Sequence, residues 1–195
     1  MSKIVDVDQR RLELARATAN VIARRGVAGA SMREVAAEAG WTTGTLAHYF
    51  TNKRELLAFT LENSLEQRRD KRAERTDLES TDPLRAMLSV ALPADDEGRL
   101  HWTVTVAFAA HAASDDQLQR VQRDAYRSFR SHLVALLLED AAITLDGAII
   151  EAERLIALVD GIALQALFDP ETWPPERQYD ALEAGLVAQA TAVRA

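Results

Sequence analysis

Apolar side chains recur every three or four positions along most of the chain, which is the spacing of one face of an α-helix. Residues 8–25 show this pattern first, and Gly26 stands where a helix commonly ends. One face of this first helix carries four apolar residues: Leu12, Ala15, Ala19 and Ile22. The pattern predicts a bundle of helices rather than a sheet.

Two short helices are predicted directly after the first. In "SMREVAAEAG", Ser31 and Glu34 have the S-x-x-E spacing of a capping box, and Gly40 ends that helix after about two turns. In "WTTGTLAHYF", either Thr42 or Thr43 caps the second short helix, whose buried side is Leu46 and Phe50. Two short helices joined by a tight turn and flanked by longer ones are typical of a helix-turn-helix, whose second helix enters the major groove.

The rest of the chain predicts six longer helices. A long helix starts near Asn52, whose N-x-x-E spacing with Glu55 is a weaker capping signal. Five more follow: one between Asp82-Pro83 and Pro93, then 99–113, Ser114 to about 140, 148–168 and 176–193. We therefore expect an all-α protein of about nine helices. Residues 1–53 would form a three-helix helix-turn-helix DNA-binding domain and residues 54–195 a larger helical ligand-binding and dimerisation domain.

Charge is distributed unevenly between these two parts. The whole chain carries a net charge of −7, which by itself argues against a nucleic-acid partner. Residues 1–53, however, contain eight Lys and Arg against five Asp and Glu, whereas the remainder contains 15 against 25. This asymmetry indicates that the N-terminal part meets a polyanion and the C-terminal part does not.

Composition also narrows the function. The chain has no cysteine, which excludes disulfides and thiolate metal sites, and we see no signal peptide or membrane-spanning stretch, so we expect a cytoplasmic protein with no membrane partner. No two of the four histidines have metal-ligand spacing along a helix, and no nucleotide-binding or hydrolase motif is present. We therefore predict no metal site, no cofactor, no catalytic residue and no enzyme activity.

Residues 31–57 resemble the DNA-binding domain of the TetR family of one-component transcriptional regulators. The matching segments are "SMREVAAEAG", "TTGTLAHYF" and "NKRELL". The helix order of the whole chain resembles that family more loosely. The segment "LVDGIALQALFDP" at 158–170 resembles the regulatory domain of a subgroup that includes the choline-responsive BetI regulators, which implies a domain type and not choline as the ligand. The chain departs from the family pattern at Trp41 and Ala47.

The resemblance implies a set of DNA-contacting residues, and their chemistry suits the role. Threonine hydroxyls, a glycine that lets the backbone approach, and His, Tyr, Lys and Arg side chains all bind phosphates or base edges. The candidates are Arg33, Thr42, Thr43, Gly44, Thr45, His48, Tyr49 and Lys53. Taken singly, each threonine is more often a helix cap or a surface residue than a DNA contact.

The central helices carry aromatic residues that could line a ligand pocket. In the family, the corresponding helices enclose a cavity, and a generic binding site is an apolar pocket with a few polar groups. The candidates are Trp102, Phe108, His111, Tyr126 and Phe129. The alternative is that the aromatic residues among them pack the core.

The last two helices are apolar on more than one face, so each is buried on more than one face. In TetR-like proteins this pair forms a four-helix bundle with its symmetry mate, and Gly161 and Gly185 could allow close approach. The candidate dimer residues are Leu155, Val159, Ile162, Leu182 and Leu186, although core burial alone would also explain them. Asp160 is either a partnered acid of an interface or pocket, or an edge residue.

Together these features predict a homodimeric, ligand-responsive transcriptional regulator, and specifically a repressor. It would bind a pseudo-palindromic operator in double-stranded DNA and leave it when an unknown small-molecule effector binds. A second hypothesis keeps the fold but not the DNA: a dimeric helical ligand-binding or protein-interaction module with a vestigial helix-turn-helix.

Overall fold

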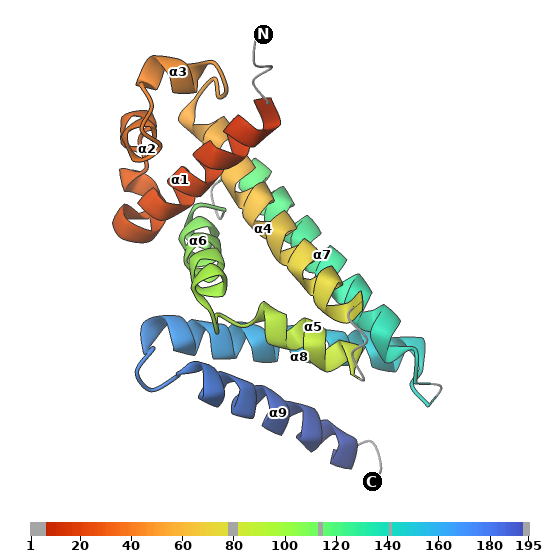
Figure 1. The fold of residues 1–195 in the computed structure, drawn as a ribbon. Coiled ribbons are helices and arrows are strands. Elements are labelled where there is room, and N and C mark those ends of the chain that lie inside the picture. The colour runs from red at the N-terminus through yellow and green to blue at the C-terminus, as the bar shows by residue number, and fades with distance from the viewer. Residues whose placement is uncertain (1–6, 78–81, 113–114, 141, 193–195) are drawn as a thin grey trace. The chain divides into compact units, whose positions relative to one another are not determined.

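The computed structural model describes residues 7–77, 82–112, 115–140 and 142–192, and over these residues the secondary structure consists of α-helices joined by short connections (Figure 1). Nine helices follow one another within that part of the chain: α1 (Val7–Gly29), α2 (Met32–Glu38), α3 (Thr43–Ala47), α4 (Lys53–Asp77), α5 (Pro83–Ala91), α6 (Asp96–Ala112), α7 (Asp116–Leu137), α8 (Leu145–Phe168) and α9 (Pro175–Ala192). The predicted all-α class and helix order are confirmed.

Helix starts follow the side chains that satisfy the first free backbone N–H groups. Ser31, Thr42 and Asp82 cap α2, α3 and α5 as predicted. Two starts are earlier than predicted. The segment expected to be a loop before residue 99 is the first turn of α6, because the Asp95 carboxylate accepts the Gly98 N–H at 2.6 Å. Similarly, Thr144 caps α8 three residues before the predicted start at residue 148.

The residue predicted to cap α7, Ser114, lies outside the described residues, and so do residues 113 and 193 at predicted helix ends. The Asp115 carboxylate accepts the N–H groups of Gln117 and Leu118 at 2.9 and 3.3 Å. This carboxylate therefore caps the helix.

The regular part of α1 ends at Gly26, as predicted, because that residue has φ +69° and ψ 172°. This left-handed φ suits glycine, which lacks a Cβ. Of the predicted buried face of α1, Ala15, Ala19 and Ile22 are buried. Leu12 is 45% exposed instead, and Leu14 is buried.

The chain divides into two compact units, and each consists of two stretches of sequence. Unit 1 comprises Met1–Glu66 and Thr103–Arg123, and unit 2 comprises Gln67–Trp102 and Asp124–Ala195. The domain boundary predicted after residue 53 stays a prediction.

In unit 1, α2 packs on both α1 and α3, and the start of α4 follows α3 after a short turn (Figure 1). The largest fully buried side chains of this unit are aliphatic and aromatic: Leu14, Ile22, Leu46, Phe50, Leu56, Leu61 and Phe108. This core positions the two short helices.

In unit 2, α8 and α9 pack against each other, and α5 packs on both (Figure 1). Their shared core includes Leu88, Leu155 and Leu182, which are fully buried. A buried cation lies beside it: the Arg68 guanidinium donates to the carbonyls of Val90 and Leu92, which end α5. Lys71, one turn further along α4, pairs with Asp95 at 2.8 Å and Glu97 at 3.0 Å.

Candidate nucleic-acid interface

Helix α3 has one buried face and one exposed face. Leu46 is fully buried, and so is Phe50 just beyond the helix, so these two side chains anchor α3 in the core of unit 1. The opposite side is exposed and carries hydroxyl and imidazole groups. Its exposed residues are Thr42, Thr43, Gly44, Thr45, Ala47 and His48. The helix therefore presents a polar face that the core does not use.

The start of α3 depends on a pair of threonines. The Thr42 hydroxyl accepts the Thr45 N–H at 3.1 Å, and the two side-chain oxygens lie 2.9 Å apart. Of the two residues considered from the sequence, Thr42 is the cap. Thr43 and Gly44 lie in the first turn of α3. They take no part in the contact between Thr42 and Thr45, and both are exposed.

The turn between α2 and α3 is set by the backbone. Gly40 adopts φ +71°, which reverses the chain after α2, and the Trp41 N–H donates to the Ala36 carbonyl at 2.8 Å. The Ser31 hydroxyl accepts the Glu34 N–H at 3.2 Å at the other end of α2. The Gly40 turn and the Trp41 hydrogen bond therefore connect α2 to α3, and the Ser31 cap stabilises the start of α2.

Two ion pairs join α1 to α2 at the surface. Arg24 binds Glu38, and Arg25 binds Glu34 at 3.1 Å. The hydrogen bond from Arg24 lowers the pKa of the Glu38 carboxyl below its usual range. Arg33, the DNA candidate on α2, is exposed and directly precedes Glu34 in the sequence.

A capping box also starts α4. The Asn52 side chain accepts the Glu55 N–H at 2.9 Å, and the Glu55 carboxylate accepts the Thr51 N–H at 2.8 Å. This arrangement confirms the weaker of the predicted start signals. It also fixes the chain between α3 and α4, so the position of α3 depends on α4.

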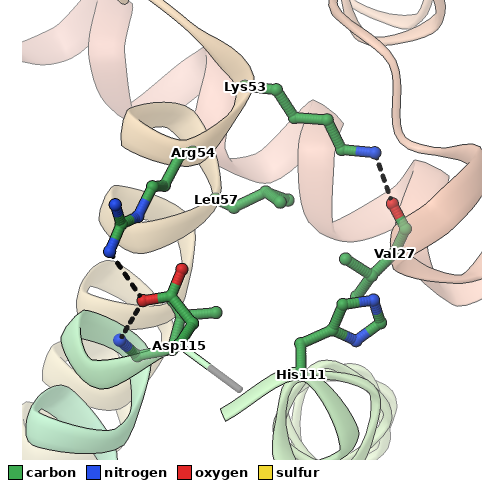
Figure 2. Close-up of a pocket in the computed structure, with 7 residues that line it drawn as sticks. Val27, Lys53, Arg54, Leu57, His111 and Asp115 are labelled. Carbon is green, nitrogen blue, oxygen red and sulfur yellow. Dashed lines mark hydrogen bonds and ion pairs between the residues drawn. The ribbon is translucent and has the colours of Figure 1, made fainter.

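Lys53 is the first residue of α4 and is not part of the exposed face of α3. Its ammonium group donates to the carbonyl of Val27 at 2.8 Å (Figure 2). It also donates to the carbonyl of Ala28 at 3.2 Å. These carbonyls follow the break of α1 at Gly26, so Lys53 binds the end of α1. A contact with phosphate would have to compete with those two hydrogen bonds.

Trp41 and Tyr49, on either side of α3 in sequence, are in contact. Their ring centroids are 5.5 Å apart and the ring planes are tilted by 52°. Both side chains are half-buried. The tryptophan that departs from the family pattern therefore supports Tyr49, which is one of the predicted DNA-binding residues.

Unit 1 also contains a pocket of about 360 Å³ beside Lys53 (Figure 2). Its lining combines apolar side chains with charged ones: Val27, Lys53, Arg54, Leu57, His111, Asp115 and Leu118. Arg54 and Asp115 are paired across it at 3.0 Å, and that hydrogen bond lowers the pKa of the Asp115 carboxyl. His111, a predicted ligand residue, lines this pocket.

The other predicted ligand residues divide between the two units. Phe108, in unit 1, is 1% exposed. Trp102, in unit 2, is buried, and its indole N–H donates to the Ala91 carbonyl at 2.7 Å. For these two residues the alternative reading, core packing, accounts for what the structure describes.

Tyr126 and Phe129 lie on α7 within unit 2, and each has a charged neighbour. The Tyr126 hydroxyl donates to the Asp160 carboxylate at 2.9 Å, and burial raises the pKa of both groups above their usual values. The Arg72 guanidinium lies 4.6 Å from the centre of the Phe129 ring. Burial, with Arg68 and Arg69 nearby, lowers the pKa of Arg72 to about 10.

Asp160 is thus a partnered acid, one of the roles considered from the sequence. Arg68 and Arg72 were missed because "EQRRDKRAER" reads as a solvated helix face. The sequence signal for a buried arginine is that several arginines lie close together on a helix that continues from an apolar segment. Such a signal does not specify which arginine is buried.

The predicted dimer residues need correction. Leu155, Val159, Ile162 and Leu182 are at most 4% exposed within one protomer, so they pack the core of that protomer. Leu186 alone is half-buried. A helix buried on two faces gives two apolar stripes, and the stripe chosen from the sequence is the one that faces inward.

The outward faces of α8 and α9 also carry apolar side chains. Ile150, Phe168 and Val187 are 68%, 74% and 61% exposed, respectively. Gly161 lies on the exposed face of α8, and a Cβ built there meets no described atom within 4 Å beyond its own helix. Gly185 has a different role, because a Cβ there would collide with the Leu158 side chain, so its absence lets α9 approach α8.

No group of three or more His, Cys, Asp or Glu residues in the described part of the chain is arranged to hold a metal ion. None of the helices in that part is both long and apolar enough to cross a membrane.

Both halves of the chain match known protein families. Residues 14–58 match the family described as "Bacterial regulatory proteins, tetR family". Residues 80–191 match the family described as "BetI-type transcriptional repressor, C-terminal". Together the two matches cover the helix-turn-helix and most of the helices that follow it.

Similar proteins are regulators. The chain is 37% identical to the HTH-type transcriptional regulator PksA of Bacillus subtilis (strain 168), covering 87% of this chain and 84% of that protein. It is 31% identical to the HTH-type transcriptional regulator BetI of Vibrio campbellii, covering 88% and 87%.

Solved structures are similar as well. A transcriptional regulator from Rhodococcus sp. Rha1 superposes with a TM-score of 0.82 at 33% identity, covering 91% of this chain and 94% of that one. A putative transcriptional regulator from Saccharomonospora viridis, determined in complex with choline, superposes with a TM-score of 0.81 over 91% and 95% of the two chains. At 19% identity, that likeness concerns the fold alone.

Proposed function

This chain belongs to the TetR family of bacterial regulatory proteins and is a DNA-binding transcriptional regulator, and we propose that it is a repressor released from its operator by a small molecule. Its α3 enters the major groove of double-stranded DNA. We place its action in the cytoplasm, where the bacterial chromosome lies. The boundary after residue 53 separates the DNA-binding part from the part that binds effector and partner.

One observation carries the proposal: the exposed face of α3 is polar while Leu46 and Phe50 anchor the opposite side. A helix held in this way can present Thr43, Gly44 and His48 to base edges without losing its core contacts. Thr42 and Thr45 combine capping with exposure, so their hydroxyls can also reach phosphate. Arg33 supplies a positive charge on the neighbouring helix.

The same protein would act as a homodimer on a pseudo-palindromic operator. The outward face of α8 and α9, with Ile150, Gly161, Phe168 and Val187, supports pairing with a second copy of the chain. Two α3 helices related by a two-fold axis would reach successive major grooves, about 34–36 Å apart. The operator half-sites should then be spaced by whole helical turns.

We propose that the effector binds in unit 2 near Tyr126, Phe129 and Asp160. The half-buried Asp160 carboxylate, which accepts from the Tyr126 hydroxyl at 2.9 Å, favours a molecule that carries a positive charge. Choline, which the Saccharomonospora viridis regulator binds, is therefore the first compound to test. An effector that prefers the conformation unable to bind DNA lowers operator affinity by that preference, typically about 1–3 kcal/mol.

Selection of bound sequences from random duplex DNA tests the DNA-binding proposal. We expect a palindromic consensus, and we expect binding to that consensus to weaken steeply as salt increases because phosphate contacts release counterions. Thr43→Ala and His48→Ala should each weaken binding to the consensus. The matched control is His132→Ala, which removes an exposed histidine of unit 2.

The alternative function, an interaction module with a vestigial helix-turn-helix, predicts that the same selection finds no DNA consensus. Such a protein would dimerise and bind its ligand, but selection would enrich no palindrome. Its DNA affinity, if measurable, would be equal for wild type, Thr43→Ala and His132→Ala. The exposed polar face of α3 favours the regulator.

A further inference from the structure

We propose that Trp41 positions Arg10 beside Tyr49, so that Arg10 and Tyr49 together form a second DNA-backbone contact next to α3. This inference rests on the proposed function, because it assigns further residues to the same interface. Arg10 has no role in the set of DNA contacts that the sequence implied. Trp41 acts through the two residues it touches and is a positioning residue.

Trp41 is held firmly enough to serve as a support. Its backbone N–H donates to the Ala36 carbonyl at 2.8 Å, which ties it to the end of α2. One part of its ring contacts Tyr49 at a centroid distance of 5.5 Å. Its side chain is half-buried, so part of the indole remains available at the surface.

Arg10 uses that surface. Its guanidinium carbon lies 5.4 Å from the centre of the Trp41 ring, within the range in which a cation is attracted to an indole face. Arg10 is on the first turn of α1, and the start of α1 and α3 lie at the same end of unit 1 (Figure 1). A positive charge is therefore held next to the polar face that is proposed to meet DNA.

The remaining partner of Arg10 can be exchanged for phosphate. Arg10 forms an ion pair with Glu13 at 2.8 Å, and both side chains are 41% exposed. Exposed pairs one turn apart on a helix are weak, because water and salt screen them. A duplex phosphate offers the guanidinium a bidentate acceptor within a polyanion, so Arg10 can leave Glu13 without leaving Trp41.

Arg10 and Tyr49 both suit a phosphate. The guanidinium donates two parallel hydrogen bonds and the phenol donates one. Contacts of this kind set the register of a protein on DNA and carry no base preference of their own. The cluster should therefore contribute to affinity and to salt dependence while leaving the selected consensus unchanged.

The first test compares Arg10→Ala with Arg16→Ala on the consensus duplex. Arg16 is an exposed arginine of the same helix, so both variants remove one charge from α1. We expect Arg10→Ala to weaken binding about tenfold and to reduce the slope of log K against log salt by about 1. Arg16→Ala should keep the wild-type slope. Glu13→Gln, which frees Arg10, should strengthen binding.

The second test addresses Trp41. Trp41→Leu should weaken binding in the wild-type background but cost less when Arg10 is already alanine, since one role of Trp41 is to hold Arg10. Trp41→Phe should restore most of the affinity. Circular dichroism and thermal unfolding of each variant identify any loss of fold, in which case the Arg10 comparison alone decides.

Two results would overturn the inference and are distinguishable. If wild type binds its consensus but Arg10→Ala has the same affinity and slope as Arg16→Ala, this inference is wrong and the proposed function stands. If wild type selects no consensus and binds duplex DNA without salt dependence, the proposed function fails and the inference fails with it.

Discussion

At the scale of single residues, Arg11 shows a charged side chain used for packing. Its guanidinium lies 4.7 Å from the centre of the Phe50 ring and 4.5 Å from that of Phe59. A weaker pair with Glu55, at 3.6 Å, adds to this contact. Arg11 therefore connects α1 to Phe50, just after α3, and to Phe59 on α4.

We predict that Arg11→Ala lowers the free energy of unfolding by about 1–2 kcal/mol, because it removes two cation–π contacts and the packing of the side-chain stem. The corresponding fall in Tm is about 2–8 °C. Thermal unfolding followed by circular dichroism measures it. Arg16→Ala, an exposed control on the same helix, should change stability by less than about 0.5 kcal/mol. An equal loss in both variants would contradict the role of Arg11.

Asp160 gives a prediction for pH dependence. Burial raises the pKa of its carboxyl above the usual value of 3.8, so the folded protein holds this proton more tightly than the unfolded chain. Its contribution to stability is therefore greatest at low pH and declines as pH rises from 3.8 through the raised pKa. Asp160→Asn removes this decline and keeps an oxygen to accept from Tyr126.

We expect the Tm of Asp160→Asn, relative to wild type, to increase as pH rises across that window and then to level off. Thermal unfolding between pH 4 and pH 8 measures this difference, and contributions from other titrating groups cancel between the two proteins. A Tm difference that is independent of pH would show that the pKa of Asp160 is the same in the folded and unfolded states.

Local residue roles were predictable where the partner is close in sequence. Ser31 and Glu34, or Thr42 and Thr45, are three residues apart, so their spacing alone indicates the hydrogen bond. The Lys53 ammonium, in contrast, binds a carbonyl 26 residues away. That contact depends on how α1 packs beside α4, which periodicity does not encode, so Lys53 was assigned to phosphate.

At the scale of elements, α3 depends on its cap to an unusual degree because it spans only the five residues Thr43–Ala47. Isolated helices of this length are unstable, so the end contacts and the burial of Leu46 maintain it. The same cap residue lies on the face proposed to bind DNA. Stability and binding can nevertheless be separated by substitution.

We predict that Thr42→Ala lowers the free energy of unfolding by about 0.5–2 kcal/mol, through loss of the N-cap, and weakens DNA binding as well. Thr42→Asn, which can still accept the Thr45 N–H, should retain the stability. Thr43→Ala should weaken binding alone. Chemical denaturation and operator titration of the three variants measure both quantities, and a stability loss for Thr43→Ala equal to that of Thr42→Ala would contradict the assignment of the cap.

Helix starts were predictable only in part, for a related reason. Asp82-Pro83 is a strong signal and α5 begins there. "PADDEG" contains loop-forming residues, yet Asp95 caps α6 within it, since an aspartate serves equally in a turn and at a helix N-terminus. In the structure the Asp95 carboxylate also binds Lys71 of α4, a contact that the local sequence does not indicate.

At the scale of the whole molecule, the sequence indicated the fold but not which apolar stripes face outward. Leu155 of α8 and Leu182 of α9 each belong to an apolar stripe at helical spacing, and both are fully buried within one protomer. Ile150 and Val187 are also apolar, and they are exposed. The sequence pattern around the buried pair and around the exposed pair is similar. A helix face that pairs with another protomer needs the same apolar side chains as a face that packs on α5.

The exposed stripe leads to a prediction about assembly. Gly161→Arg places a long charged side chain at the middle of the outward face of α8, where the protomer leaves space. We expect the protomer to stay folded, since arginine favours helix over glycine by up to about 1 kcal/mol, and we expect the dimer to dissociate. Sedimentation velocity should then give a mass near 21.5 kDa instead of twice that value.

A matched control for this substitution is Ala23→Arg, which introduces the same side chain at an exposed position of α1 in unit 1. It should leave the dimer intact. Loss of operator binding in Gly161→Arg, with normal binding in the control, would connect dimerisation to DNA recognition. Persistence of the dimer in Gly161→Arg would exclude this face as the interface.

The composition of unit 1 has a consequence for protein engineering. Because the unit joins Met1–Glu66 to Thr103–Arg123, the core that supports α3 is not encoded by one uninterrupted stretch of gene. A chimaera that exchanges only the first 66 residues would pair a foreign helix-turn-helix with the native Phe108 and Leu118, both buried. Transplanting operator specificity therefore calls for exchange of the α3 surface alone, or of both stretches together.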